Sequence, residues 1–321
     1  MSSEEHRAAH IDNEKCISCG ACVYQCPFGA IVDKSFILDA VNLIKGSHEN
    51  QDYKVYAVVA PSISSQFSYA KLGQVITGIQ RLGFYHVIEA ALGADMVAYK
   101  EAAELAEKGF LTSSCCPAFV SYIKKNFPTM VDKISHNLSP AAEIGRYIKE
   151  TTPGAKVVFI GPCAAKKLEA SRRTIRSDVD FVLTFEEVMG MFEAKAIKFS
   201  EVAAGPELVE ATADGRGFAV SGGVANAVVN AIHKMDPDRE VKVMAAQGLQ
   251  ECKKMLMLAK AGKLNGYLLE GMACPGGCVA GAGTLQNPVK STAALNKYKA
   301  SAPEKYSVDS KYEITLNLLH D

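Results

Sequence analysis

The sequence predicts an α/β protein in which parallel sheets are flanked by helices, preceded by a small cysteine-rich unit. From about residue 55 onward, short apolar, β-branched stretches alternate with longer stretches of helical periodicity. This alternation is typical of parallel strands joined by crossover helices. Residues 1–50 are built around a dense run of cysteines, and "ENQDYK" (49–54) resembles a linker. We therefore expect two domains, residues 1–50 and 51–321.

The first half of the larger domain shows the alternation clearly. "VYAVVAP" (55–61) is apolar and β-branched, which predicts a buried strand. Helical periodicity follows at 68–83 and at 93–109, where a final glycine suits a C-cap. "FLTSSCCPAF" (110–119) predicts a strand or turn that leads into a helix at 120–128.

The second half continues in the same way. Helices are expected, from their periodicity, at 140–153, 185–195 and 249–262. Strands are expected, from their short apolar runs, at 155–160, 180–184, 241–247 and 263–271. Residues 217–235 predict a strand, a glycine turn and a helix, and residues 287–321 are a polar tail with a possible final strand or helix.

Composition restricts the class of protein. Of 321 residues, 48% are hydrophobic and 22% charged, and 35 Lys+Arg balance 35 Asp+Glu. A net charge of zero argues against binding nucleic acid or acidic lipid through bulk charge. No apolar run reaches the roughly 18 residues that a membrane span needs, and the polar N-terminus lacks a secretory signal. We expect a cytoplasmic protein that binds neither nucleic acid nor membranes.

Ten cysteines are the most unusual feature of the sequence. A disulfide framework suits small secreted proteins, whereas clustered thiols in a cytosolic protein are more often metal ligands or catalytic groups. Cys163 follows the strand "KVVFI", Cys274 follows "GYLLE", and Cys115 and Cys116 follow "FLTS". Because ligands bind beyond the carboxyl ends of parallel strands, these loops are expected to meet at one site. Cys252, within "LQECKKML", is interpreted as a core thiol.

The N-terminal run has the spacing of a bacterial ferredoxin. Cys16, Cys19, Cys22 and Cys26 follow the pattern C-x-x-C-x-x-C-x-x-x-C-P, which predicts a 4Fe–4S cluster. A structural zinc site is the alternative. In two-cluster ferredoxins the fourth cysteine of a run binds the other cluster, so Cys26 either closes this cluster or leaves its fourth ligand to another group.

Three further motifs resemble the signature motifs of the iron-only (FeFe) hydrogenases, over residues 55–285. They are "LTSSCCPAF" (111–119), "IGPCAAKKLE" (160–169) and "EGMACPGGCVAGAG" (270–283). Gly161, Phe119 and Ala141 depart from the commonest family pattern, in which GPC reads MPC, and indicate a less studied branch. The resemblance implies two parallel-sheet lobes with the active site between them and a ferredoxin-like N-terminal unit.

The resemblance also implies an H-cluster, a 4Fe–4S cube bridged to a two-iron unit that carries carbon monoxide, cyanide and a dithiolate amine. The implied cube ligands are Cys116, Cys163, Cys274 and Cys278, with Cys278 as the bridging thiolate. Residues implied beside the two-iron unit are Lys166, Met272, Ala60, Pro61 and Ser62. Whether Lys167 and Glu169 are only a surface charge pair is left open.

A proton relay is the last implied feature. Its residues would be Glu104, Ser135, Glu101 and Cys115. Glu101 and Glu104 share one helix face, for which an ordinary solvated surface is the alternative. Cys115 is spare in the ligand count, and a thiol can act as a general acid.

The implied function is the anaerobic, reversible conversion of two protons and two electrons into hydrogen. Ferredoxin would exchange electrons through the N-terminal cluster, and maturation proteins would supply the two-iron unit. The alternatives are a low-turnover hydrogen sensor and a cytosolic iron–sulfur assembly factor of similar fold.

Overall fold

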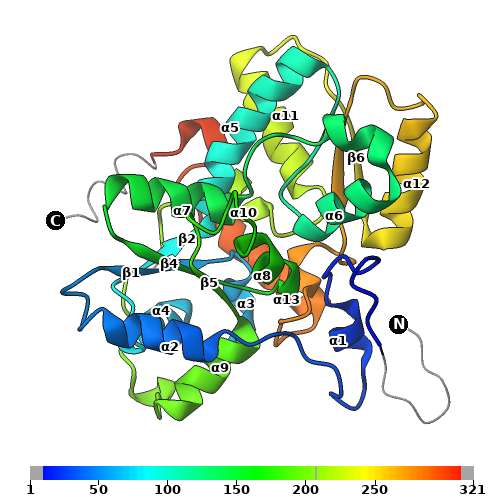
Figure 1. The fold of residues 1–321 in the computed structure, drawn as a ribbon. Coiled ribbons are helices and arrows are strands. Elements are labelled where there is room, and N and C mark those ends of the chain that lie inside the picture. Colours follow the sequence, from blue (N-terminus) through cyan, green and yellow to red (C-terminus); the bar gives the residue numbers. More distant parts are fainter. Residues whose placement is uncertain (1–9, 207, 312–321) are drawn as a thin grey trace.

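The protein folds around two separate parallel sheets (Figure 1). The computed structural model describes residues 10–206 and 208–311. The first sheet has the strand order β2-β1-β4-β5. Its strands are β1 (Val55–Val59), β2 (His86–Glu89), β4 (Lys156–Gly161) and β5 (Phe181–Thr184). Every residue of β1 is buried, because β1 lies inside the sheet and is covered by helices on both faces.

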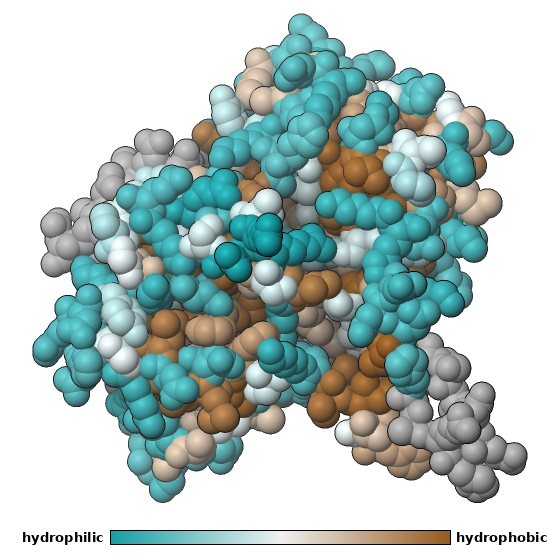
Figure 2. Space-filling model, viewed as in Figure 1, coloured by the Kyte–Doolittle hydropathy of each residue, from teal (hydrophilic) through white to brown (hydrophobic). Residues whose placement is uncertain are grey.

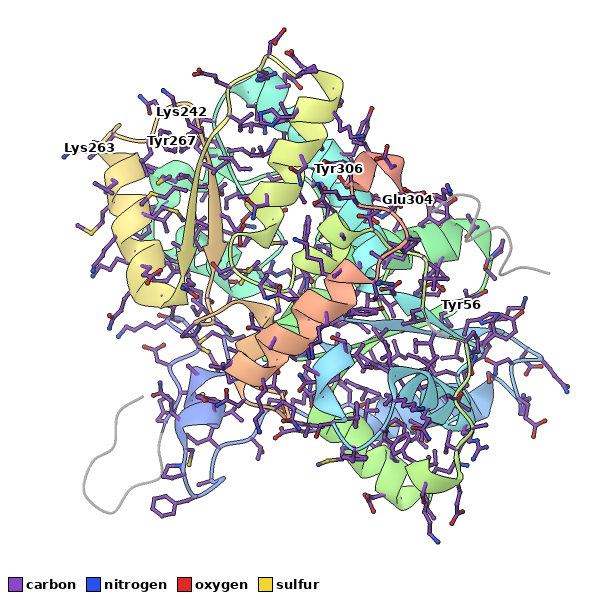
Figure 3. The ribbon with its side chains drawn as sticks, turned by 180° about the vertical axis from the view of Figure 1, so that it is seen from behind. Tyr56, Lys242, Lys263, Tyr267, Glu304 and Tyr306 are labelled. Atoms are coloured by element: carbon purple, nitrogen blue, oxygen red, sulfur yellow. The ribbon has the colours of Figure 1, made fainter. Side chains whose placement is uncertain are left out.

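The second sheet has the order β3-β7-β6. Its strands are β3 (Leu111–Thr112), β6 (Lys242–Gln247) and β7 (Tyr267–Met272). All neighbouring strands run parallel, with Lys242 beside Tyr267 where β6 and β7 begin (Figure 3). The carboxyl ends of the strands therefore share one edge within each sheet.

Helices cover both sheets and connect them (Figure 1). The long helix α5 (Ala90–Lys108) packs against α7 (Pro140–Thr151) beside the first sheet and against α11 (Gly223–Met235) beside the second. The other α-helices are α1 (Ala21–Gln25), α2 (Ile37–Gly46), α3 (Ile63–Gln66), α4 (Leu72–Arg81), α6 (Pro117–Asn126), α8 (Ala164–Ala170), α9 (Phe185–Ala194), α10 (Ala213–Gly217), α12 (Gly248–Lys260) and α13 (Pro288–Ala300). Short 3₁₀ helices are η1 (Pro128–Lys133), η2 (Phe199–Glu201), η3 (Cys278–Ala280) and η4 (Ser307–Asp309).

The predicted fold class is confirmed, and one predicted strand is wrong. The segment that begins at residue 217, expected to start as a strand, instead ends helix α10 and continues as turns as far as α11. The reason is a tight reversal: a Cβ atom on Gly223 would lie 1.9 Å from the carbonyl oxygen of Gly217. Strand β2 was not predicted, and the tail forms helix α13. Residues 312–321, the end of the predicted tail, lie outside the described residues.

The N-terminal unit lies against the second lobe. Lys125 of α6 donates hydrogen bonds to the main-chain oxygens of Asn13, Glu14 and Cys16 at 3.0, 2.7 and 2.8 Å. Gly20 has a left-handed φ of 77°, and a Cβ atom there would lie 2.5 Å from the Cβ of Ala282. Because α2 packs against α9 and β5 of the first lobe, the unit contacts both lobes. The domain boundary at residue 50 stays a prediction.

A buried ion pair ties α13 and α10 to the end of β2. The guanidinium of Arg216 donates to the two carboxylate oxygens of Glu89 at 2.8 and 3.1 Å, and the Tyr298 hydroxyl also bonds Glu89. All three side chains are buried. Bidentate pairing with extra hydrogen bonds is the arrangement in which buried charges are tolerated.

Among the residues described, no helix is both long and apolar enough to cross a membrane.

Candidate functional site

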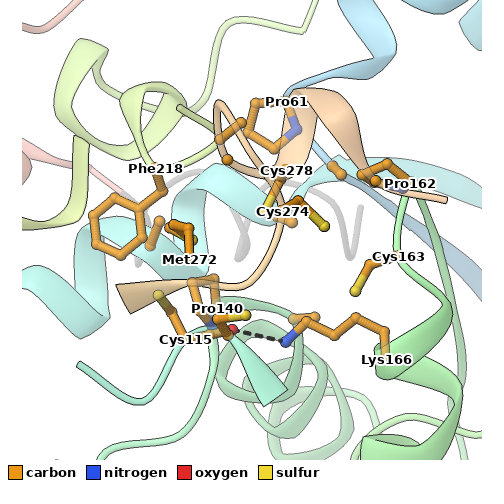
Figure 4. A pocket seen from close by; sticks show the side chains of 18 of the residues that line it. Pro61, Cys115, Pro140, Pro162, Cys163, Lys166, Phe218, Met272, Cys274 and Cys278 are labelled. Atoms are coloured by element: carbon orange, nitrogen blue, oxygen red, sulfur yellow. Dashed lines mark hydrogen bonds between the residues drawn. The ribbon is translucent and has the colours of Figure 1, made fainter. Parts of the chain in front are cut away.

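A cavity lies where the ends of the two sheets meet (Figure 4). Its walls come from the segments that follow β1, β3, β4 and β7. This is expected, because ligands bind beyond the carboxyl ends of parallel strands. Five of its lining residues are cysteines: Cys115, Cys116, Cys163, Cys274 and Cys278. Cysteine loops that are 47 residues (Cys116 to Cys163) and 111 residues (Cys163 to Cys274) apart in sequence thus converge on one space.

Three of these cysteines are placed at the start of a helix. Cys116 and Cys163 are the N-cap residues of α6 and α8, and Cys278 opens η3. The Pro-Gly-Gly kink has a steric cause at Gly277, whose φ is 95° and whose Cβ would lie 2.8 Å from the main-chain nitrogen of Ser221. Only glycine combines that φ with so close an approach at low cost.

The four predicted cube ligands fit a cationic, soft metal group. Burial raises the pKa of Cys163 to about 11, and it also raises the pKa values of Cys116, Cys274 and Cys278. Buried thiols become thiolates only beside a compensating positive charge, which iron supplies. Within the described part of the chain, no group of three or more His, Cys, Asp or Glu side chains is placed to hold a single metal ion. A cube, in contrast, distributes its thiolates over separate irons.

Lys166 is buried in the cavity wall and held by two acceptors. Its Nζ donates to the Glu169 carboxylate at 2.7 Å and to the main-chain oxygen of Cys115 at 3.4 Å (Figure 4). Burial alone would lower the pKa of Lys166, but the adjacent Glu169 carboxylate raises it. Lys166 is therefore a fixed cation in an otherwise apolar wall.

The surface charge pair considered for Lys167 and Glu169 is wrong. Both side chains are buried and they have separate partners. Lys167 bridges Asp33 at 2.8 Å and Glu187 at 2.9 Å, whereas Glu169 also accepts a hydrogen bond from Ser139 at 3.0 Å. Glu169 thereby orients Lys166.

The remaining predicted residues beside the cavity divide into two groups. Met272, Ala60 and Pro61 line it. Ser62 is fully buried at the start of α3, is absent from the described cavity wall, and has a hydroxyl without a hydrogen-bond partner among the described residues. The structure brings the first three together but does not bring Ser62 to the wall.

Two departures from the family pattern have a structural counterpart. A Cβ atom on Gly161 would lie 2.6 Å from the ring of Phe159, which itself lines the cavity. The Phe159 ring thus fills space that a longer side chain at position 161 would need. Phe119 is fully buried with its ring against Gly271, whose Cβ would lie 2.2 Å from the ring.

The four predicted relay residues lie close to one another between α5 and the cavity, but one carboxylate oxygen of Glu101 has no hydrogen-bond partner among the described residues. The Ser135 hydroxyl donates to Glu104 at 2.8 Å, and the buried Glu101 accepts from the Ser114 main-chain nitrogen at 3.4 Å. Burial raises the pKa of Glu101 to about 7, while Ser114 and Ser135 partly offset that effect. Burial also raises the pKa of Cys115 well above its usual value, and the neighbouring Glu101 charge raises it further. A solvated face, the alternative for Glu101, is wrong.

Glu104 has the opposite character. Burial tends to raise its pKa, but hydrogen bonds from Lys108 and Ser135 lower it overall. Asn137 donates to the same carboxylate at 2.8 Å. The two glutamates of the helix face are therefore different: burial raises the pKa of Glu101, whereas the pKa of Glu104 is lowered overall.

The N-terminal cysteines lie next to the cavity rather than in it. Cys16, Cys19, Cys22 and Cys26 are free and partly exposed. Ile17 and Cys19 pack in one cluster with Cys116 and Cys163. The two predicted cluster sites are thus joined by direct packing.

Some residues of the site were not singled out in the sequence. Glu270 is fully buried and accepts hydrogen bonds from the main-chain nitrogens of Gly222 at 2.7 Å and Ala225 at 2.8 Å. Burial raises its pKa to about 7. The position of Glu270 inside the EGMAC motif is the sequence signal that could have identified it. Phe218 lines the cavity from the segment that was expected as a strand. Cys252 is fully buried in the core, as expected.

The fold and the site define an iron–sulfur protein with a buried, cysteine-lined cavity between two parallel-sheet lobes. The family model described as "Iron only hydrogenase large subunit, C-terminal domain" matches residues 53–282, and a 4Fe–4S binding domain matches residues 9–32. The chain belongs to the iron-only hydrogenase large-subunit family.

Curated relatives of two kinds are similar to this chain. The NADP-reducing hydrogenase subunit HndD of Solidesulfovibrio fructosivorans is 26% identical over 94% of this chain, which spans 62% of that protein. The periplasmic iron hydrogenase large subunit of Nitratidesulfovibrio vulgaris is 29% identical over 85% of both chains. The cytosolic Fe–S cluster assembly factor NAR1 of Scheffersomyces stipitis is 26% identical over 60% of this chain and 40% of its own.

Solved structures agree in fold. A variant of FeFe-hydrogenase HydA1 from Chlamydomonas reinhardtii superimposes with a TM-score of 0.72 over 88% of this chain and 94% of that chain, at 22% identity. At this identity the likeness concerns the fold alone.

Proposed function

We propose that the protein is an FeFe hydrogenase that interconverts protons, electrons and hydrogen. The observation that carries the proposal is the conjunction of a four-cysteine cavity with a fixed lysine and a separate series of acid groups that ends at a fifth cysteine. A protein that only carries clusters needs the first of these features and has no use for the others.

In this proposal Cys116, Cys163, Cys274 and Cys278 would hold the cube, and Cys278 would also serve as the thiolate shared with the two-iron unit. Lys166 would offer its ammonium group to a cyanide ligand as a charge-assisted hydrogen-bond donor. Met272, Ala60 and Pro61 line the cavity and would exclude water beside the cofactor. The bound cofactor supplies the redox chemistry at iron, including its carbon monoxide and dithiolate amine ligands.

The chain itself moves the proton. Cys115 keeps its proton at neutral pH because its pKa is raised, so it is a donor at the cavity wall. Glu101, with a pKa of about 7, re-protonates it, and Ser135 connects Glu101 with Glu104. A general acid of this kind contributes roughly 10²–10⁴-fold to a proton-limited rate.

Electrons would pass through a 4Fe–4S cluster on Cys16, Cys19, Cys22 and Cys26. Figure 2 shows hydrophobic surface in the region of α1, and its exposed side chains include Tyr24, Phe28 and Val32. Exposed apolar patches often mark protein contacts, which favours a ferredoxin or a similar carrier as partner. Maturation proteins and a cytoplasmic location are part of the same proposal, although one relative is named periplasmic.

The activity is tested by loading the chain, produced without maturation proteins, with a synthetic two-iron complex in the absence of oxygen. We expect no hydrogen before loading and hydrogen evolution from a reduced viologen afterwards. The named assembly-factor relatives support a second candidate, in which cubes are bound and hydrogen is never produced. Slow turnover that rises little with donor concentration would favour a sensor.

Electron transfer through the N-terminal cluster gives a separate prediction. Cys19→Ser should remove the iron of about one cube, because a thiolate ligand is lost. Turnover with ferredoxin should fall, while turnover with a small artificial donor should partly survive. Iron analysis and both assays check this, with Cys252→Ser as the matched control. Unchanged iron and unchanged ferredoxin coupling would contradict the electron-transfer role.

A further inference from the structure

One titratable side chain at the outer end of the acid series has no role in the scheme above. His136 lies on the loop that follows η1, with 76% of its side chain exposed. Its main-chain nitrogen donates to both carboxylate oxygens of Glu104, at 3.1 and 3.2 Å. Its ring Nδ1 lies 3.2 Å from Nζ of Lys108 and 3.6 Å from Oε1 of Glu104. The imidazole ring of His136 is therefore exposed to solvent and also lies beside the outermost carboxylate, that of Glu104.

Glu104 is poorly suited to collect protons from water by itself. Donors from Lys108, Ser135 and Asn137 all stabilise its ionised form, and its pKa is lowered overall despite burial. A carboxyl group whose pKa is lowered in this way is ionised most of the time near neutral pH. Hydronium is scarce there as well, so supply of protons to Glu104 needs a group that exchanges readily with water. Imidazole meets this need, because its ring can both accept a proton from water and donate one to a carboxylate.

We propose that His136 takes up protons from solvent and delivers them to Glu104. Uptake adds one proton to the neutral ring. Delivery breaks the Nδ1–H bond and forms an Oε1–H bond on Glu104, after which the ring is neutral again and no electron has moved. The side chain is 76% exposed to water while its Nδ1 lies 3.6 Å from the carboxylate. The inference rests on the proposed function, since it extends the same proton relay.

The charges around the ring are compatible with both steps. Lys108 and Glu104, both on α5, face the ring and pair with each other at 2.6 Å, so their effects on a charged imidazole oppose one another. On η1, Asp132 and Lys133 pair with each other at 3.0 Å. In the neutral state Nδ1 is an acceptor for Lys108, and in the charged state it is a donor toward Glu104.

The test uses the full chain loaded with the two-iron complex, driven by a reduced viologen. The variant is His136→Gln, which keeps an acceptor for Lys108 but cannot titrate. The control is His48→Gln, since His48 is equally exposed and bonds a carboxylate, Asp52, at 2.6 Å in another part of the chain. Hydrogen evolution is measured from pH 5 to pH 8 in a dilute buffer of bulky ions.

We expect His136→Gln to match the parent at pH 5, where hydronium is plentiful, and to lose activity about tenfold at pH 8, less than the roughly 10²–10⁴-fold of an inner relay group. Added imidazole should restore the loss, because it carries protons to Glu104 directly. His48→Gln should follow the parent throughout. No loss at pH 8, a loss independent of pH, or a loss that imidazole does not restore would each overturn the inference.

A second readout needs no activity. In the chain without the two-iron unit, the ring-proton NMR signals of His136 should move on Glu104→Gln and stay in place on Glu251→Gln, which alters an exposed carboxylate of α12. Equal responses to both would overturn the contact. Different results would contradict the relay and the role of His136. If Cys115→Ala leaves activity intact, the relay itself is wrong. If Cys115→Ala abolishes activity and His136→Gln has no effect, only the role of His136 is wrong.

Discussion

Replacing Cys115 by alanine is expected to lower hydrogen turnover by roughly 10²–10⁴-fold while leaving the metal content unchanged. The thiol lines the cavity, yet the four other cysteines suffice for a cube. The raised pKa of Cys115 favours the protonated thiol. Glu101, whose pKa is also raised by burial, is the next residue of the proposed relay. Alanine removes the last donor and little packing volume. Iron content, infrared spectrum and hydrogen evolution are measured on the same preparation.

Two outcomes would contradict this prediction in different ways. Near-normal turnover in Cys115→Ala would mean that the thiol only packs in the wall. Loss of the cluster in that variant would mean that Cys115 is a ligand and that the ligand assignment is wrong. Cys252→Ala is the matched control, because Cys252 is also a buried thiol but lies in the core beneath β6 and β7.

Replacing Cys116 by alanine is expected to remove the cube of the catalytic site and all turnover. Cys116 lies at the N-cap of α6, where its thiol faces the cavity, and the loss of one of four thiolates leaves an iron without its protein ligand. Iron should fall by about one cube, whereas the N-terminal cluster should remain visible in the electron paramagnetic resonance spectrum. Circular dichroism shows whether the fold survives.

The contrast between the neighbouring cysteines is the informative part. A chain that retains all its iron in Cys116→Ala, with normal turnover, would contradict the proposed ligand set. If Cys115→Ala and Cys116→Ala have the same effect on iron, the separation of ligand and relay roles is wrong. The adjacent pair thus tests two roles with nearly the same change in volume.

Much of the cavity could be predicted because its signals are local. Cys163 and Cys274 directly follow apolar strands, and parallel strands bring their carboxyl ends to a shared edge. Gly109, which was predicted to cap the helix at 93–109, does end α5, and it has the left-handed φ of 69° that favours glycine. Motif spacing, strand pattern and turn chemistry are all properties of a few consecutive residues.

The errors concern features that depend on distant contacts. The segment at 218–222 has a strand-like apolar pattern, but it has no neighbouring strand and is forced into a turn by the contact of Gly223 with Gly217. Lys167 has the spacing of a surface lysine and is buried only because Asp33 and Glu187 approach it from other elements. His136 carries no motif, and its place beside Glu104 appears only in three dimensions.

The central claim is that the cavity holds a two-iron unit with carbonyl and cyanide ligands beside a cube. The most direct test is an infrared spectrum of the chain after loading with the synthetic two-iron complex, removal of unbound complex, and reduction without oxygen. The account predicts bands of iron-bound carbonyl and cyanide that stay with the protein and shift from those of the free complex. Absence of such bands, with the iron–sulfur cubes intact, would contradict the hydrogenase function and favour an assembly factor.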